Sequence, residues 1–283
     1  MSDMHTAQYY GTAAPKSAAD ALTQHAEELT TLGYTVVPSV LLPEELENWR
    51  QRIDAVYETQ EREFGGAEAL AAIGEKDMCR APLLYDRAFV EMARCDAVLS
   101  IVRRLLGDWV ILNLQNAIIN RPAERHHQSA WHRDLPYQNW VISKPLAIGA
   151  LFAIDPFNEE TGGTLVVPHS HRQEAMPSEQ FVHVHAVQVE AEPGSVLLFD
   201  AMVFHRAGSN QSSHVRRGVN HLYTVPILKQ QYDFPRALGE QFAANAEVMQ
   251  LLGFTSTVPV DALQWRNERL QRLAPKAGNG ASS

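Results

Sequence analysis

Between residues 110 and 225, the chain is a series of short apolar runs separated by turn residues, and residues 229–270 return to helical and loop character. Glycine, proline and asparagine punctuate the series, as at Pro156-Phe157-Asn158 and Pro193-Gly194. Evenly spaced short strands with such turns are typical of an antiparallel sandwich or barrel. The runs lie at residues 110–120, 148–154, 164–167, 183–189, 195–199 and 218–225. They predict a double-sheet jelly roll.

Helical patterns dominate the first hundred residues. Apolar positions recur at helical spacing in residues 17–32, before Gly33, and in residues 86–106. Between them, residues 34–37 are typical of a strand, and Pro43 opens a second helix. Residues 65–82 predict a loop, a helix and a loop. The fold class we expect is mainly β with flanking helices, in which the N-terminal helices buttress the jelly roll.

Length and composition restrict the possible domain organisations and the classes of partner. We predict a flexible arm at residues 1–15, a single domain at 16–273 and a disordered tail at 274–283. The formal net charge of −9 argues against a nucleic-acid or anionic-membrane partner. No run approaches the ~18 apolar residues that span a bilayer, and the start lacks a signal-peptide pattern. Two cysteines are too few for a disulfide framework. We therefore expect a cytoplasmic protein that acts on a small molecule.

One group of residues indicates a metal site. His132 and Asp134 are two positions apart, so on a strand both side chains point to the same side. His205 follows an apolar run that ends at Phe199, and Arg216 lies 11 residues further on. Two imidazoles and one carboxylate form the facial triad of non-haem Fe(II) oxygenases, with the remaining metal positions open. An arginine beside such a triad can grip a carboxylate with two parallel hydrogen bonds. The prediction rests on the set, because each residue alone is a weak signal.

Nearly the whole chain resembles the phytanoyl-CoA dioxygenase family of Fe(II)/2-oxoglutarate oxygenases. The resemblance includes Trp-His-Arg-Asp at 131–134 and His-Arg-Ala-Gly-Ser-Asn at 205–210, followed by Arg216. The other matching segments are Gly-Tyr-Thr-Val-Val-Pro at 33–38, Leu-Pro-Glu-Glu-Leu at 42–46, Ile-Ile-Asn-Arg-Pro at 118–122 and Glu-Thr-Gly-Gly-Thr-Leu-Val-Val-Pro-His-Ser-His at 160–171. Thr161 and His169 depart from the family's usual Asn and Gly, which leaves the local loop conformation open.

The resemblance implies a double-stranded β-helix, cupin-like fold and a set of roles. His132, Asp134 and His205 would bind Fe(II) and act as the catalytic centre. Arg216 would pair with the distal carboxylate of the cosubstrate 2-oxoglutarate, with Thr164 and Gln115 as further contacts. We expect O2 to bind the remaining metal position and an unactivated C–H of a small-molecule metabolite to be oxidised, with succinate and CO2 released. The presence of Asp134 disfavours halogenation, since related halogenases have a small residue there.

Several alternatives stay open from the sequence. A cupin-type metalloenzyme without 2-oxoglutarate would make Arg216 dispensable, and a non-catalytic jelly-roll binding protein would retain iron poorly. His183 and His185 alternate on a predicted strand as a cupin metal pair would, but we favour a simple strand face. Hydroxylation is the default outcome, and a free metabolite is favoured over a CoA thioester. A homodimer through the C-terminal helical part is not demonstrated. Trp131, Tyr137, Trp140 and Phe204 flank the metal residues and could wall an apolar pocket, with core packing as an equal alternative. For His126 and His127 we favour a solvated loop pair over a place at the substrate entrance.

Overall fold

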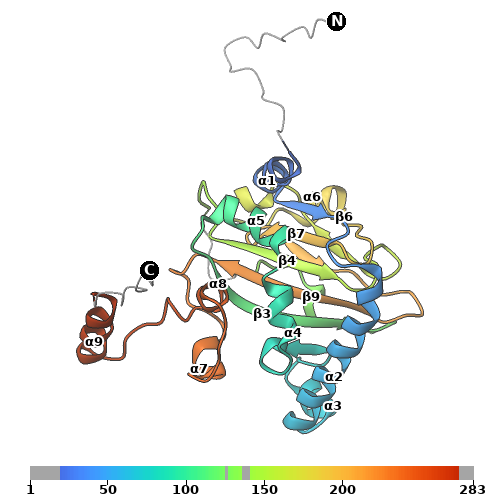
Figure 1. Ribbon diagram of the computed structural model, residues 1–283. Helices are drawn as coiled ribbons and strands as arrows, with labels where there is room; N and C mark the ends of the chain where they lie inside the picture. Colours follow the sequence, from blue (N-terminus) through green and yellow to red (C-terminus); the bar gives the residue numbers. More distant parts are fainter. Residues whose placement is uncertain (1–19, 125–126, 136–140, 274–283) are drawn as a thin grey trace, which may run out of the picture.

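Two antiparallel sheets form the centre of the computed structural model, which describes residues 20–124, 127–135 and 141–273 (Figure 1). The strands are β1 (Tyr34–Val37), β2 (Met78–Arg80), β3 (Ile111–Asn120), β4 (Ala147–Ala153), β5 (Thr164–Val166), β6 (Val187–Gln188), β7 (Val196–Asp200), β8 (His205–Ala207) and β9 (Arg216–Thr224). The larger sheet has the order β1-β7-β4-β9-β3-β2, and the smaller one β6-β5-β8. These sheets confirm the predicted jelly roll. The expected N-terminal arm and C-terminal tail lie outside the described residues.

Helices cover one face of the larger sheet. The helices of the described residues are α1 (Ala21–Thr31), α2 (Leu46–Phe64), α3 (Ala67–Ala72), α4 (Ala88–Ala93), α5 (Asp96–Leu106), α6 (Glu179–His185), α7 (Phe234–Leu238), α8 (Ala246–Leu251) and α9 (Ala262–Leu273). Those with buried side chains in the core on this face are α1 to α5, α7 and α8. The largest core cluster joins Leu29 of α1, Ile53 of α2 and Phe89 of α4 to strand residues such as Phe152. This cluster is the predicted helical buttress. In Figure 1, α9 stands apart from both sheets.

Local chemistry explains where the buttress helices begin and end. The Asp20 side chain accepts a hydrogen bond from Thr23 N at 2.7 Å, which caps the start of α1. Beyond its end, Gly33 adopts φ 90°, and a Cβ there would meet Val203 and His171. The glycine therefore lets the chain turn closely into β1.

Side-chain alternation gives the larger sheet two different faces. On β3, Ala117 and Ile119 join the helix-covered core, whereas Ile118 points between the two sheets. On β9, Val219 and Tyr223 join the same core. Successive strand residues point to opposite faces, and a bulge between Leu112 and Leu114 shifts the alternation on β3. The even-numbered residues of β9, and those of β3 from Leu114 onward, therefore line the interior of the jelly roll. The interior face carries the candidate site.

Three expectations about individual elements are corrected. The run at 183–189 contains the end of α6, capped by the Ser178 side chain, and only the two-residue β6. The helix expected at 86–106 is two helices, α4 and α5, separated at Arg94 and Cys95. The segment 65–82 contains the edge strand β2 in addition to its helix. Among the described residues, no helix combines the length and apolar character needed to cross a membrane.

Candidate metal centre

Backbone hydrogen bonds join the two distant parts of the candidate centre. His132 and His205 pair as an isolated antiparallel bridge, with both N–H to O distances at 3.0 Å. Two residues further along, Asp134 N donates to Ala201 O at 3.0 Å. The loop that carries His132 and Asp134 therefore extends the smaller sheet beside the start of β8. This pairing closes the 71-residue gap between Asp134 and His205.

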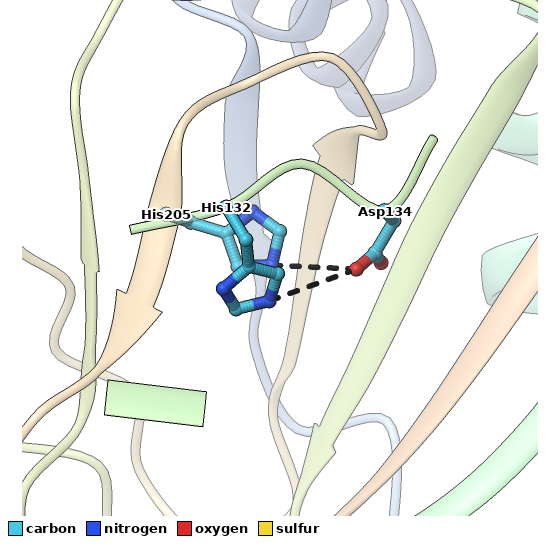
Figure 2. A group of neighbouring side chains, drawn as sticks. All are labelled: His132, Asp134 and His205. Atoms are coloured by element: carbon cyan, nitrogen blue, oxygen red, sulfur yellow. Dashed lines mark ion pairs between the residues drawn. The ribbon is translucent and has the colours of Figure 1, made fainter. Parts of the chain in front are cut away.

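The three predicted ligands converge on one point. Their potential ligand atoms all lie within 4.8 Å of one another. Figure 2 shows both imidazoles directed at the same carboxylate oxygen, Oδ1 of Asp134. It lies 3.9 Å from His132 Nε2 and 3.6 Å from His205 Nε2. The structure thus brings together the triad expected from the sequence.

A hydrogen bond from Nδ1 to a backbone carbonyl fixes the orientation of each imidazole. His132 Nδ1 lies 2.8 Å from Ala130 O, and His205 Nδ1 lies 3.0 Å from Val203 O. A carbonyl only accepts, so Nδ1 carries the proton and Nε2 presents a lone pair to the cluster. Backbone carbonyls commonly fix metal-binding histidines in this way. The donor set suits a divalent transition metal.

The carboxylate of Asp134 is nearly buried and only partly satisfied. Burial opposes its ionisation, but its hydrogen bond with His205 and the charges of both histidines outweigh burial, and the pKa of Asp134 is lowered. Its Oδ2 has no hydrogen-bond partner among the described residues. A buried polar atom without a partner is costly unless a ligand satisfies it. Asp134 therefore fits a metal ligand with an anionic charge.

Arg133, between the two loop ligands, points to the opposite side and anchors the loop. Its guanidinium donates to Met202 O at 2.8 Å, Glu174 O at 2.8 Å and Ser170 O at 3.1 Å, and also to Gln173 O. It lies 3.9 Å over the ring of Phe204. The sequence carried no signal for this role, because the acceptors are backbone atoms of a distant turn.

We expect Arg133→Met to destabilise the fold by about 2–4 kcal/mol, because four buried or partly buried backbone carbonyls lose their donor. Iron affinity should also fall about 10–100-fold, as is typical when the support of metal ligands is removed. Urea denaturation and iron titration measure the two effects. Arg236→Met, at an exposed arginine of α7, is the control and should change stability by less than about 0.5 kcal/mol. Wild-type values for the Arg133 variant would contradict the anchoring role.

Arg216, the first residue of β9, is buried beside the triad. It lines one narrow cavity together with His132, Asp134, His205 and Thr164. Its Nη2 donates to Gly162 O at 2.6 Å, its guanidinium lies 4.6 Å from the centre of the Phe157 ring, and its Nε has no partner. Burial lowers the pKa of the guanidinium to about 10. A buried cation with unpaired N–H groups suits an anionic ligand.

Gln115 requires a correction. It shares a strand face with Ala117 and Ile119 as expected, but that face is the helix-covered one. Its Oε1 accepts from Leu83 N at 3.0 Å, and its Nε2 lies 2.8 Å from Phe89 O and 2.7 Å from His221 Nε2. The amide is fully buried in contacts that join β3 to the helices and to β9. It therefore does not reach the cavity that holds Arg216.

The two departures from the family turn are accommodated locally. Thr161 N donates to Asn158 Oδ1 at 2.9 Å, and Thr161 Oγ1 donates to Pro156 O at 2.6 Å. His169 adopts the left-handed φ of 66°, and its Nδ1 lies 2.7 Å from Thr31 O. Between them, a Cβ on Gly162 would lie 2.6 Å from Gly208 O, so only glycine fits without displacement. The turn thus presents Gly162 O to Arg216.

The remaining sequence candidates lie elsewhere. His183 and His185 are exposed on α6, and neither joins the triad. Trp131 lies under Arg206 at 5.0 Å, and neither it nor Phe204 is among the described residues that line the cavities at the triad. Tyr137, Trp140, His126 and the side chain of His127 fall outside the described part of the chain.

A larger cavity of about 690 Å³, called the chamber below, opens above the triad. Its lining residues are Arg80, Asn113, Leu114, Asn116, Gln128, Ala130, His132, Arg133, Asp134, Leu135, Asn220, Leu222, Leu228, Lys229, Gln230 and Gln231. Asn220 lines both this chamber and the Arg216 cavity. Sequence reasoning missed it, although strand alternation from Arg216 places it on the same face. The chamber gives a small molecule access to the metal centre.

Asp200, at the end of β7, provides a test by pH. Burial raises its carboxyl pKa to about 6 from the ordinary 3.8. The raised pKa means that the folded state favours the protonated carboxyl. The free energy of unfolding therefore decreases as the pH rises from about 4 to about 6, and the decrease is complete above that range. Asp200→Asn removes this ionisable group, and with it the loss of stability, so the variant should be more stable than wild type by about 2–3 kcal/mol at about pH 8. Urea denaturation should show the gain vanishing near pH 4; an equal gain at both pH values would refute the assignment.

Comparisons with known proteins agree with this geometry. Residues 30–218 match the family described as Phytanoyl-CoA dioxygenase (PhyH). The chain is 38% identical over 265 residues to the uncharacterized protein Rv1501 of Mycobacterium tuberculosis, covering 90% of this chain and 95% of that protein. A shorter match, 31% identical over 136 residues, covers 46% of this chain and 43% of the dioxygenase andF of Emericella variicolor.

A solved structure has a similar fold. The epimerase SnoN, crystallised in complex with Fe3+, alpha ketoglutarate and nogalamycin RO, aligns with a TM-score of 0.54 and 19% identity. The alignment covers 72% of this chain and 83% of that chain. At this level of identity, the likeness supports the double-stranded β-helix architecture and carries no information about the substrate of this chain.

Proposed function

The chain belongs to the phytanoyl-CoA dioxygenase family of Fe(II)/2-oxoglutarate-dependent dioxygenases, and on that premise we propose that it oxidises an unactivated C–H bond of a small-molecule metabolite. Hydroxylation is the reaction outcome we favour. The observation that carries the proposal is the convergence of His132, Asp134 and His205 beside a buried arginine. This arrangement combines an open metal site with a nearby anion site.

The residues of the site would have separate roles in binding the metal, the cosubstrate and the substrate. The triad would hold Fe(II) by the two Nε2 atoms and the carboxylate of Asp134. Arg216 would grip the distal carboxylate of 2-oxoglutarate, with the Thr164 hydroxyl lining the same cavity. Bound iron and 2-oxoglutarate supply the oxidising power for C–H oxidation, with O2 consumed and succinate and CO2 released. The protein positions the substrate C–H in the chamber and keeps bulk water from the centre.

The test is succinate formation by protein loaded anaerobically with Fe(II) and 2-oxoglutarate and then exposed to O2. We expect slow succinate release even without substrate, and none from protein loaded with Zn²⁺ in place of iron. Bound iron with no succinate would favour the cupin-type enzyme that needs no cosubstrate. Failure to bind iron would favour a non-catalytic binding protein.

Two further expectations accompany this function. Cys79 is buried and its thiol pKa is raised to about 12, chiefly by burial, so it is a poor nucleophile. An inert thiol is compatible with the cytoplasmic location predicted from the sequence. The homodimer through the C-terminal helical region also stays a prediction.

A further inference from the structure

The lining of the chamber combines apolar, amide and cationic side chains. Six of its side chains carry an amide, five are apolar, and three, those of Arg80, Arg133 and Lys229, carry a positive charge. Asp134, already assigned to the metal centre, is the sole carboxylate among the described lining residues, and no Phe, Tyr or Trp is among them. Ligand sites for apolar molecules are usually lined by apolar and aromatic side chains. This chamber differs in that its five apolar side chains alternate with amides and cations, which can bind a ligand that also carries polar groups.

Some of the amides serve the fold and are not available to a ligand. Asn113 Nδ2 donates to Lys229 O at 2.9 Å, and Asn113 Oδ1 accepts from Gln231 N at 3.0 Å. Gln230 Nε2 donates to Leu112 O at 2.7 Å. These bonds hold the segment 229–231 against β3. They fix the position of Lys229 and Gln231 at the chamber wall.

Other polar groups stay available. Asn220 is almost buried at the junction with the Arg216 cavity, and its Oδ1 has no hydrogen-bond partner. The exposed Lys229 forms no ion pair with the described residues, and the Gln231 side chain makes no hydrogen bond with them. A buried amide oxygen without a partner is costly, so a ligand that donates a hydrogen bond there is favoured. A hydroxyl group meets that need.

Arg80 supplies directed hydrogen bonds with little net charge. Its Nε and Nη2 both bind the carboxylate of Glu75. The remaining nitrogen, Nη1, lies 3.1 Å from the side-chain amide of Asn116, on the chamber side. The guanidinium of Arg133 is occupied by backbone carbonyls. Among the described lining residues, Lys229 is therefore the cation left to bind a ligand. An ammonium group on a flexible stem suits a carboxylate or a phosphate.

We propose that the substrate is an oxygen-rich anion, with hydroxyl groups and one carboxylate or phosphate. This proposal rests on the proposed function and names its substrate class. Lys229 binds the anionic group, Arg80 Nη1 binds a neighbouring oxygen, and Asn220 accepts a hydrogen bond from a hydroxyl close to the metal centre. An amine is disfavoured by Lys229, and an extended apolar skeleton would leave the amide groups without partners.

Binding is measured by calorimetry under anaerobic conditions, on protein loaded with Fe(II) and 2-oxoglutarate. The probes are glucose 6-phosphate, glucuronate, glucose, glucosamine and farnesol. We expect at least one of the two anions to bind about tenfold or more tightly than glucose, a difference of roughly 1.4 kcal/mol. Glucosamine and farnesol should bind most weakly. Preference between the two anions distinguishes a phosphate from a carboxylate as the recognised group.

Variants locate the binding to Lys229. Lys229→Gln should reduce the anion affinity about tenfold and leave glucose affinity unchanged. Lys144→Gln, at an exposed lysine outside the chamber, is the matched control and should change neither. The substrate proposal is overturned if neither anion binds, if glucose or farnesol binds as tightly, or if Lys229→Gln has no effect. Failure of succinate formation would instead refute the oxygenase function, whatever the probes show.

Discussion

Replacing Asp134 with asparagine is expected to lower Fe(II) affinity by at least about 100-fold, more than the loss of a supporting residue typically does. Asparagine keeps the size of the side chain and removes its charge. The divalent cation would then have only neutral ligands, two imidazoles and an amide. The missing negative charge has a large effect because the site is nearly buried. Competition with a metal chelator under anaerobic conditions measures the affinity, and succinate formation should fall with it.

Asp200→Asn is the matched control for this variant. Asp200 is also a nearly buried carboxylate, on the strand that precedes β8, but it is not part of the triad. Its replacement should leave iron affinity unchanged while it alters stability with pH. Wild-type iron affinity in the Asp134 variant would mean that the metal binds elsewhere. Equal losses in both variants would indicate a general effect of charge rather than ligation.

Much of the fold was predictable because it depends on local patterns. The strand at 34–37, the glycine stop after α1 and most central strands follow from apolar spacing and turn residues. The break between α4 and α5 was missed because the apolar repeat continues through it. The strand predicted where α6 lies was wrong because the alternating His183 and His185 imitate a period of two. The signal for a helix is the cap at Ser178, which lies before the apolar run.

The candidate site was predictable only in part, for a related reason. The pair His132 and Asp134 is local, since a spacing of two sets both side chains on one side. The strand face of Gln115 was identified, but which face the helices cover is decided by the tertiary packing. Arg133 binds backbone atoms of a distant turn, so no pattern in the sequence indicates its role. Long-range contacts of this kind require the structure.

Strand alternation at the start of β9 provides a sharp experiment on the cosubstrate. Adjacent arginines point to opposite faces: Arg216 into the cavity beside the triad, and Arg217 outward to Asp54 at 2.9 Å and Asp155 at 3.3 Å. The two positions carry the same chemical group within one residue of each other. Comparing variants at the two positions therefore distinguishes the effect of removing an arginine from the effect of removing the anion site.

We expect Arg216→Met to weaken 2-oxoglutarate binding roughly 150- to 4,000-fold, because removing one partner of a buried ion pair costs about 3–5 kcal/mol. Arg217→Met should leave the affinity within about twofold and lower stability modestly, since its ion pairs are partly exposed. Calorimetry on Fe(II)-loaded protein without O2 measures both. Without cosubstrate, the Arg216 guanidinium is buried and has no carboxylate partner, so Arg216→Met should unfold at no lower temperature than wild type. Loss of binding in a fully stable variant would therefore assign the anion site to Arg216, and unchanged binding would favour an enzyme that needs no 2-oxoglutarate.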